Sequence, residues 1–281
     1  AGIVVSYVGL SFHLPSIYEV YGVRQDFKDL VSANAGPVLG YAMLMGGYSL
    51  APVSLLMGVF FFRRHCLPAI VLLVSSVFLS VVIYSGAAFK SVAFAPILSL
   101  LVYFSMGLRG NKLAILVYMW LFVFAVGYIS FLLSFGDDLF LHWIRRVFFV
   151  PGQNVIYYLD YFGFSSFGYG AEAPLIISEA YYGTGGSANS GFYGNGLAVA
   201  GVLGVLRNLL LVVFYSYMLK SVSPPKCNRL ISAAIIPFVY ALSNSATTTS
   251  LISYGGISTL VLIYLGAWAV TKSSLSGEVD T

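Results

Sequence analysis

Charged residues are scarce in this chain of 281 residues. Only 9% of them are Asp, Glu, Lys or Arg, 59% are hydrophobic, and the mean hydropathy is +0.90. Soluble domains carry about 25% charged residues. The composition therefore excludes an ordinary soluble domain and predicts an integral membrane protein.

Several chemical signatures are also missing from the sequence. It contains no cluster of metal-ligand residues, no glycine-rich phosphate loop of the Walker or Rossmann form, and no basic amphipathic repeat. We therefore expect no metal, no cofactor and no nucleic-acid partner. The net charge of +4 is attributed to membrane topology instead.

Long apolar stretches are what the sequence has in abundance. A bilayer-spanning helix needs roughly 20 mostly apolar residues, and several stretches of the chain meet this requirement. The first residues, AGIVVSYVGLSF, have the composition of the end of an earlier span. We predict an all-α polytopic membrane protein with about seven transmembrane helices plus an N-terminal helix remnant, and we expect further helices to precede this sequence. The predicted spans are 38–62, 67–84, 92–106, 113–133, 197–217, 231–247 and 251–270.

Basic residues predict the orientation. With alternating spans, eight Lys or Arg residues fall in the short loops of one side and five in the longer loops of the other, so the first side is assigned to the cytoplasm. Cys66 and Cys227 both fall on that side, where no disulfide is expected. The predicted parts are an N-terminal membrane part (1–133), a large outer loop (134–195) and a C-terminal membrane part (196–281).

The outer loop is long and rich in aromatic residues. Connections beyond about 12–15 residues are usually functional or disordered. Eleven of the thirty residues from Phe140 to Tyr169 are aromatic, which disfavours disorder and favours the membrane interface. We predict two short interfacial helices, the first ended by Pro151-Gly152 and the second over 154–162.

Arg145 and Arg146 lie in the first of these predicted helices. They either extend to water from an interfacial helix or bind an anion, because the planar guanidinium matches phosphate with two hydrogen bonds.

Five pieces of sequence, in order, resemble the Wzy-type oligosaccharide repeat-unit polymerases of bacteria. They are LPSIYEVYGVR (14–24), SGAAFKSVAFAPIL (85–98), the run from Arg146 to Gly152 with Tyr157-Tyr158, PLIISEAYYGTGGSANSGFYGNGLAVAGVLGVL (174–206), and Leu-Ser-Asn-Ser (242–245). The resemblance covers nearly the whole chain, although such polymerases usually have ten or more spans.

The resemblance implies a reaction and a place for it. A growing glycan on a polyprenyl diphosphate is transferred to the next lipid-linked repeat unit at the outer leaflet of a bacterial inner membrane, without a metal or cofactor. The implied partners are the polyprenyl-diphosphate-linked oligosaccharide, membrane lipid, a chain-length regulator and a flippase.

Candidate site residues follow from the chemistry that this reaction needs. Arg145 and Arg146 are expected to hold the departing diphosphate. Glu179 follows three apolar residues and is expected to act as a base if it is buried. The candidate substrate-binding residues are Lys90, Tyr157, Tyr158, Asn189, Asn195 and Arg207.

Each candidate also has an ordinary structural interpretation. Lys90 could anchor a helix at the interface, Glu179 could be solvated, the asparagines could serve turns beside glycines, and Arg207, near mid-span, could extend to water. Gly196, Ala200 and Gly204 are predicted to form a close helix-packing face.

Two other functions remain open on the sequence alone. One is an O-antigen ligase or another transferase on the same lipid carrier. The other is a transporter or flippase without chemistry, although we detect no internal repeat of the kind typical of transporters, and the polar residues concentrate in the outer loop instead.

Overall fold

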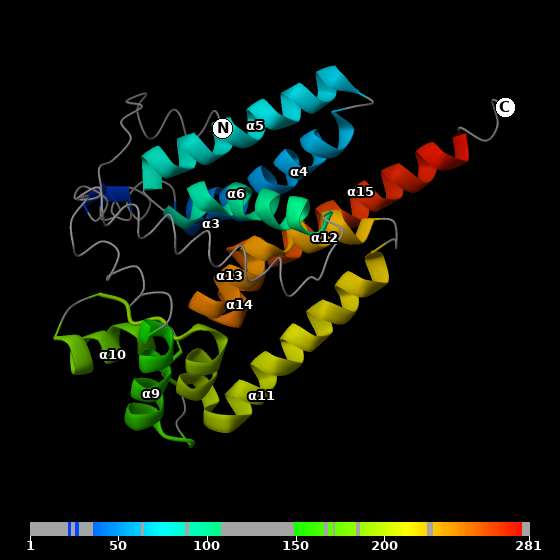
Figure 1. Cartoon of the computed structure of the whole chain (residues 1–281). Coiled ribbons are helices and arrows are strands. Elements are labelled where there is room, and N and C mark those ends of the chain that lie inside the picture. Colours follow the sequence, from blue (N-terminus) through cyan, green and yellow to red (C-terminus); the bar gives the residue numbers. More distant parts are fainter. Residues whose placement is uncertain are drawn as a thin grey trace. The chain divides into compact units, whose positions relative to one another are not determined.

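The computed structural model describes residues 22–23, 26–27, 36–62, 65–87, 90–107, 149–165, 168–170, 172–183, 186–223 and 227–276, with helices joined by short connections and no strand among them (Figure 1). The chain divides into two compact units. Unit 1 comprises residues 1–104, 216–241 and 248–281, and unit 2 comprises 105–215 and 242–247. Each unit is therefore assembled from segments that are far apart in the sequence.

Four helical segments are long and apolar enough to cross a membrane, which confirms the prediction of a helical membrane protein. They are Gly40–Phe61, Cys66–Gly86, Gly191–Val222 and Thr247–Gly266. The predicted span 92–106 corresponds to α6 (Lys90–Ser105), which has 16 residues. The predicted span 113–133 lies outside the described residues, so the total of seven stays a prediction, as does the three-part division along the sequence.

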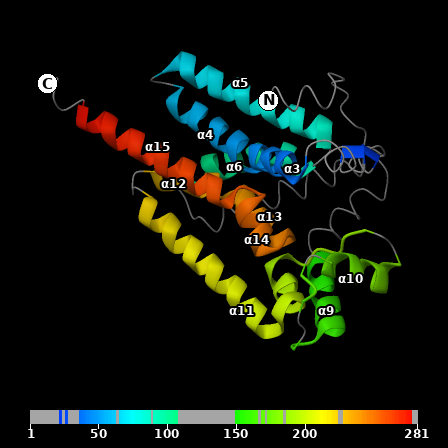
Figure 2. The same ribbon diagram turned by 180° about the vertical axis from the view of Figure 1, so that it is seen from behind.

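Two antiparallel helices form one side of unit 1. In both ribbon views α4 (Ala51–Phe61) runs beside α5 (Cys66–Ala87) (Figures 1 and 2). Gly58 permits their close approach, because a Cβ there would lie 2.8 Å from the Leu73 side chain and 3.1 Å from the Ala69 carbonyl oxygen. Small residues serve the same purpose at many helix contacts in membranes.

A π-helical turn joins α3 (Gly36–Met45) to α4 and positions a buried polar contact. The turn spans Gly46–Leu50, and the Ala51 N–H donates to the Gly46 carbonyl five residues earlier. Pro52 follows at once and cannot donate a backbone hydrogen bond, which favours the wider turn. The turn places the buried Ser49 hydroxyl where it accepts a hydrogen bond of 2.9 Å from Thr259.

Proline and glycine interrupt the last two predicted spans. The stretch 231–247 is divided between α12 (Asn228–Ala234) and α13 (Ile236–Asn244), and Pro237 stands in the first turn of α13. The stretch 251–270 is divided between α14 (Thr247–Ile252) and α15 (Gly256–Ser276), with Gly255 between them at φ +80°. Neither stretch is therefore one continuous helix, although Thr247–Gly266 as a whole is long and apolar enough to cross a membrane.

Unit 2 begins with two short helices. The predicted helix 154–162 is confirmed as α9 (Val150–Phe162). Pro151 stands in its first turn, where its fixed φ suits a helix start. The Pro-Gly pair thus opens this helix, and the predicted helix before it lies outside the described residues. Next comes α10 (Ala173–Tyr182), which ends on Gly183 in the left-handed conformation.

The long helix α11 (Gly191–Val222) is broken at Ala200 and Gly201, where the backbone leaves helical geometry. The segment 164–169 satisfies the backbone groups that the break exposes. The Phe164 carbonyl accepts from Val202 N–H at 3.1 Å, while the Val199 and Ala198 carbonyls accept from Gly168 and Tyr169. These three hydrogen bonds reduce the cost of backbone groups that have lost their helical partners in an apolar environment.

Because of the break, Gly196, Ala200 and Gly204 do not lie on one face of a continuous helix. A Cβ on Gly204 would lie 2.0 Å from the Gly196 carbonyl oxygen, so the parts of α11 before and after the break pack directly on each other. Ala200 is non-helical. The prediction of one continuous small-residue face is therefore wrong, although close packing at the two glycines is confirmed.

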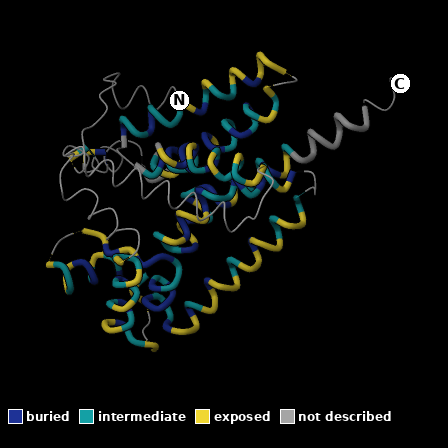
Figure 3. The backbone as a smooth tube through the Cα atoms, in the orientation of Figure 1, coloured by how far each residue is buried: buried dark blue, intermediate teal, exposed yellow. Residues whose placement is uncertain are grey.

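The distribution of burial in unit 2 follows these contacts. The buried apolar core is formed by residues of α9, α10, the loop before α11 and the first part of α11 (Figure 3). Its members are Tyr158, Phe162, Ala173, Ile177, Ala188, Leu197 and Ala198. From 202 onward many large apolar side chains of α11 are exposed, as expected for a helix in a hydrocarbon environment.

The broken helix generates a stability prediction. Gly201 has φ +56°, and an added Cβ would lie 2.0 Å from the Phe164 carbonyl oxygen. Left-handed backbone costs an L-residue about 1–2 kcal/mol, and overpacking typically adds 1–3 kcal/mol. Gly201→Ala should therefore lower the thermal unfolding midpoint in detergent clearly. Gly152→Ala in α9, which meets nothing within 4 Å, is the matched control and should be neutral or stabilising; equal midpoints for the two variants would contradict the described break.

The orientation can be tested with the cysteines. Cys66 is exposed, whereas Cys227 is buried and would resist labelling on either side. A membrane-impermeant thiol reagent should label Ser187→Cys from outside, because Ser187 is exposed in the predicted outer loop. Native Cys66 should react only after the membrane is permeabilised. The reverse order of labelling would overturn the predicted topology.

Candidate functional site

The predicted site residues whose side chains are described all belong to unit 2. Arg145 and Arg146 lie outside the described residues. Lys90 begins α6 in unit 1, and its side chain is also outside the description. The six that remain are Tyr157, Tyr158, Glu179, Asn189, Asn195 and Arg207.

A buried amide connects the main segments of unit 2. Asn154 on α9 is 2% exposed. Its Nδ2 donates to the backbone carbonyl of Asn189 at 2.7 Å, and its Oδ1 accepts from the Tyr182 hydroxyl at 2.7 Å. One side chain therefore fixes the loop before α11 and the end of α10 to α9.

Asn189 is held by its backbone, so its side chain is left at the surface. The side-chain Oδ1 accepts from the Ser187 hydroxyl at 3.1 Å, and the residue is exposed. Each amide nitrogen carries two donors. The Asn189 side chain thus presents its amide donors outward from a fixed position, as a substrate-binding residue requires.

Three tyrosine rings form a cluster between α9 and α10. Tyr157 stacks on Tyr181 with ring centroids 4.2 Å apart and an interplanar angle of 9°, and it meets Tyr182 edge-on at 5.6 Å. Gln153 Nε2 donates to the Tyr157 hydroxyl, and the Tyr181 hydroxyl donates to Asp160 Oδ2, both at 2.5 Å. The Asp160 carboxylate, by accepting this bond, raises the pKa of Tyr181 to about 12.

Tyr158 has a structural role instead of the predicted substrate contact. It is 1% exposed and lies in the core of unit 2 against Phe162. Burial raises the pKa of Tyr158 to about 12, although the nearby Ser190 hydroxyl acts in the opposite direction. The phenol is therefore neutral at physiological pH, and its burial leaves it no surface for a substrate.

Two pieces of sequence that carry the family resemblance meet in unit 2. Gly191, with φ +65°, lies so close to 242–245 that a Cβ would stand 2.4 Å from the Ser243 carbonyl oxygen and 3.1 Å from that of Leu242. The glycine is therefore required twice, by its backbone conformation and by the close approach. The segments 188–195 and 242–245 are thus neighbours despite their separation in the sequence.

Because α11 is broken at Ala200 and Gly201, Arg207 lies near the start of the second helical part and not in the middle of the predicted span 197–217. The part after the break, 202–222, has 21 residues, about 31 Å at 1.5 Å per residue and enough to cross the bilayer core. Arg207 lies in its second turn, and the prediction of a mid-span position is wrong.

Asn208 holds the Arg207 side chain. Arg207 Nη2 donates to Asn208 Oδ1 at 3.1 Å, and Asn208 Nδ2 donates to the Phe192 carbonyl at 2.7 Å. Asn208 is fully buried, whereas Arg207 is exposed. A buried amide thus connects this guanidinium to the segment 188–195.

Glu179 and Asn195 lie differently from what their sequence neighbours indicated. Glu179 is exposed on α10. The burial that would have favoured its action as a base is therefore not found. Asn195 lies inside the first part of α11, where Nδ2 donates to the Gly170 carbonyl at 3.4 Å. It therefore does not end a turn before the helix, and its side chain contacts the preceding loop.

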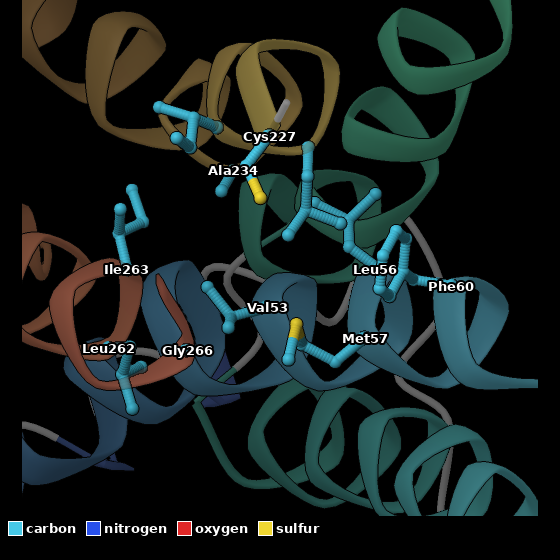
Figure 4. A pocket seen from close by; sticks show the side chains of 11 residues that line it. Val53, Leu56, Met57, Phe60, Cys227, Ala234, Leu262, Ile263 and Gly266 are labelled. Carbon is cyan, nitrogen blue, oxygen red and sulfur yellow. The ribbon is translucent and has the colours of Figure 1, made fainter. Parts of the chain in front are cut away.

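The cavity in unit 1 offers no comparable chemistry. It measures about 20 Å³ and lies between α4, α12 and α15 (Figure 4). The lining residues are Val53, Leu56, Met57, Phe60, Cys227, Leu230, Ile231, Ala234, Leu262, Ile263 and Gly266. A space so small and apolar has no group that could orient a sugar or a diphosphate.

The polar side chains described above in unit 2 are amides, phenol hydroxyls, carboxylates and the Arg207 guanidinium. Within the described part of the chain, no three His, Cys, Asp or Glu side chains lie together in a way that could hold a metal ion. The residues that organise the site, Asn154 and Asn208, were missed by the sequence analysis. Asn208 had one available signal, because an amide inside a predicted span needs a partner.

No protein-family model, no curated protein and no solved structure matches the chain.

The buried amide of Asn154 generates the prediction for this site. Asn154→Ala removes the hydrogen bonds to the Asn189 carbonyl and from the Tyr182 hydroxyl, and each lost hydrogen bond typically costs about 0.5–1.5 kcal/mol. The variant should unfold at a lower temperature, and amide hydrogens over 186–195 should exchange faster. Asn195→Ala, which removes only the long bond to Gly170, is the control and should change both readouts much less. Similar behaviour of the two variants would contradict the central position of Asn154.

Proposed function

We propose that this protein polymerises lipid-linked oligosaccharide repeat units on the outer leaflet of a bacterial inner membrane. The anomeric carbon of the growing glycan forms a bond to a hydroxyl of the incoming lipid-linked unit. Its bond to the polyprenyl diphosphate breaks, the diphosphate takes the electron pair, and the hydroxyl proton passes to a base or to water. The reaction needs no oxidant and no further reactant.

The proposal is supported best by the contact between 188–195 and 242–245. Both segments carry the resemblance to the polymerases, and they are separated by about fifty residues, yet the Gly191 backbone packs against the carbonyls of Leu242 and Ser243. Two segments chosen from the sequence alone are thus in contact within unit 2. The exposed Asn189 and the guanidinium of Arg207 are tied to the first of these segments.

The cations have a specific task in this reaction. Negative charge grows on the diphosphate as the sugar departs, and fixed positive groups at that point lower the barrier. Arg145 and Arg146 are proposed to hold the diphosphate, with Lys90 and Arg207 in support. Among the described residues of unit 2, Arg207 is the sole Lys or Arg.

We propose that help with proton removal accelerates the reaction less than help with the departure of the diphosphate. Glu179 is exposed, so it lacks the apolar surroundings that tune a carboxylate for catalysis. The diphosphate is a good leaving group and reduces the need for a strong base. Glu179 is retained as the candidate base.

The substrate's sugars and the remaining partners complete the proposal. Asn189, Asn195 and Tyr157 are proposed to bind sugar hydroxyls, because amides and phenols both donate and accept neutral hydrogen bonds. A flippase would deliver the lipid-linked units, and a chain-length regulator would act on the product.

Polymer formed in vitro from purified lipid-linked repeat units tests the proposal. Losing a charge-assisted hydrogen bond costs about 1.5–3 kcal/mol, so Arg145→Ala or Arg146→Ala should slow polymerisation by roughly ten- to a hundredfold. Arg→Lys keeps the charge but loses the planar guanidinium and should restore activity only in part. Glu179→Gln should lower the rate less than either Ala variant.

Controls separate this function from the alternatives. Arg63→Ala changes a cation predicted on the cytoplasmic side and should leave polymerisation unchanged. Full activity in both Lys variants would show that the arginines only anchor a helix. In cells, deletion of the gene should leave single repeat units at the surface; long unattached polymer would instead identify a ligase, and units trapped inside would identify a transporter.

A further inference from the structure

We propose that the partly exposed tyrosine face of α9 and α10 binds the sugar chain of the substrate, with Asp160 and Tyr181 as the main hydrogen-bonding pair. This surface, called here the tyrosine face, consists of Gln153, Tyr157, Asp160 and Tyr181, of which Asp160 is exposed and the others are half-buried. The inference rests on the proposed function and names a place for its glycan that lies apart from the diphosphate.

The rings of this face are held in position before any ligand arrives. Tyr157 and Tyr181 stack almost parallel, and Tyr182 closes the cluster edge-on while its hydroxyl is bonded to the buried Asn154. Because each ring is fixed by a neighbour, a ligand would lose little side-chain entropy on binding. Aromatic surface with polar edges is typical of sites that hold amphipathic ligands.

The polar groups around the rings leave both donors and acceptors for a ligand. Gln153 donates to the Tyr157 oxygen, so the Tyr157 hydroxyl proton is still available. Tyr181 donates to Asp160 Oδ2, and Oδ1 accepts no bond from the described residues. Sugar hydroxyls donate and accept at once, so they match a surface that offers both.

The charge of the face selects among ligands. Its described residues carry one carboxylate, Asp160, and no Lys or Arg. A phosphate or diphosphate would be repelled by this carboxylate, whereas a neutral polyol would be bound by it through a charge-assisted hydrogen bond. The raised pKa of Tyr181 keeps its hydroxyl protonated at physiological pH, so the pair with Asp160 persists.

The face is also connected to the segment with the family resemblance. Tyr182 packs edge-on against Tyr157, and the Asn154 amide that accepts from the Tyr182 hydroxyl also donates to the Asn189 backbone carbonyl. These contacts connect the tyrosine face to the segment 188–195, which carries the exposed Asn189.

Binding of two probes tests the inference, with the whole protein in nanodiscs. The first probe is the set of soluble oligosaccharides released by partial acid hydrolysis from the surface polysaccharide of the cells that make the protein. The second is sugar-free polyprenyl diphosphate. Asp160→Ala and Tyr181→Phe should weaken oligosaccharide binding by roughly tenfold or more and leave the Kd for polyprenyl diphosphate unchanged.

Tyr169→Phe is the matched control. Tyr169 lies between α9 and α10 in the sequence and is 45% exposed, and its ring contacts Phe162 instead of the tyrosine face, so the variant should bind both probes like the wild type. Unchanged oligosaccharide affinity in Asp160→Ala and Tyr181→Phe would overturn the inference. Equal loss of both probes would overturn it as well, because the defect would then lie in folding.

The result is separable from the test of the proposed function. If the wild type binds oligosaccharide at this face but forms no polymer, the glycan site stands and the polymerase proposal falls. If polymer forms and Asp160→Ala binds oligosaccharide normally, the polymerase stands and the tyrosine face is excluded as its glycan site.

Discussion

The side-chain amide of Asn154 is buried in the core of unit 2, where it has no access to bulk water. A buried amide without partners is costly, so its two hydrogen bonds, to the Asn189 carbonyl and from the Tyr182 hydroxyl, are strongly favoured. These bonds fix the loop before α11 and the end of α10 to α9. The position of the tyrosine rings, the exposure of Asn189 and the packing of Gly191 on Ser243 all depend on that fixed loop.

A second buried amide, Asn208, performs the same task within α11. It joins the two parts of α11 across the break at Ala200 and Gly201, and it holds the guanidinium of Arg207. Because the break shortens the apolar part of the helix to one bilayer thickness, the arginine lies near the end of the span. A charged group there avoids the cost of the bilayer centre.

The described charges of unit 2 lie on different segments. The tyrosine face carries the Asp160 carboxylate and neutral hydroxyls, while Arg207 on α11 is bonded to Asn208, whose amide donates to the Phe192 carbonyl. A lipid-linked glycan has the same division, with neutral sugars at one end and a diphosphate at the other. The proposed function uses this correspondence, and Arg145 and Arg146 extend it to residues chosen from the sequence.

The sequence alone determined the class of the protein, because hydropathy and helix signals are properties of neighbouring residues. Scarce charge predicted the membrane, the apolar runs predicted the described long spans, and the helix 154–162 was anticipated from local signals. Tertiary structure decided the exposure of Glu179, the depth of Arg207, the burial of Tyr158 and the organising roles of Asn154 and Asn208. Each of these depends on a partner distant in the sequence, such as the Phe164 carbonyl that accepts from Val202 N–H at the break. Patterns among neighbouring residues cannot predict such distant partners.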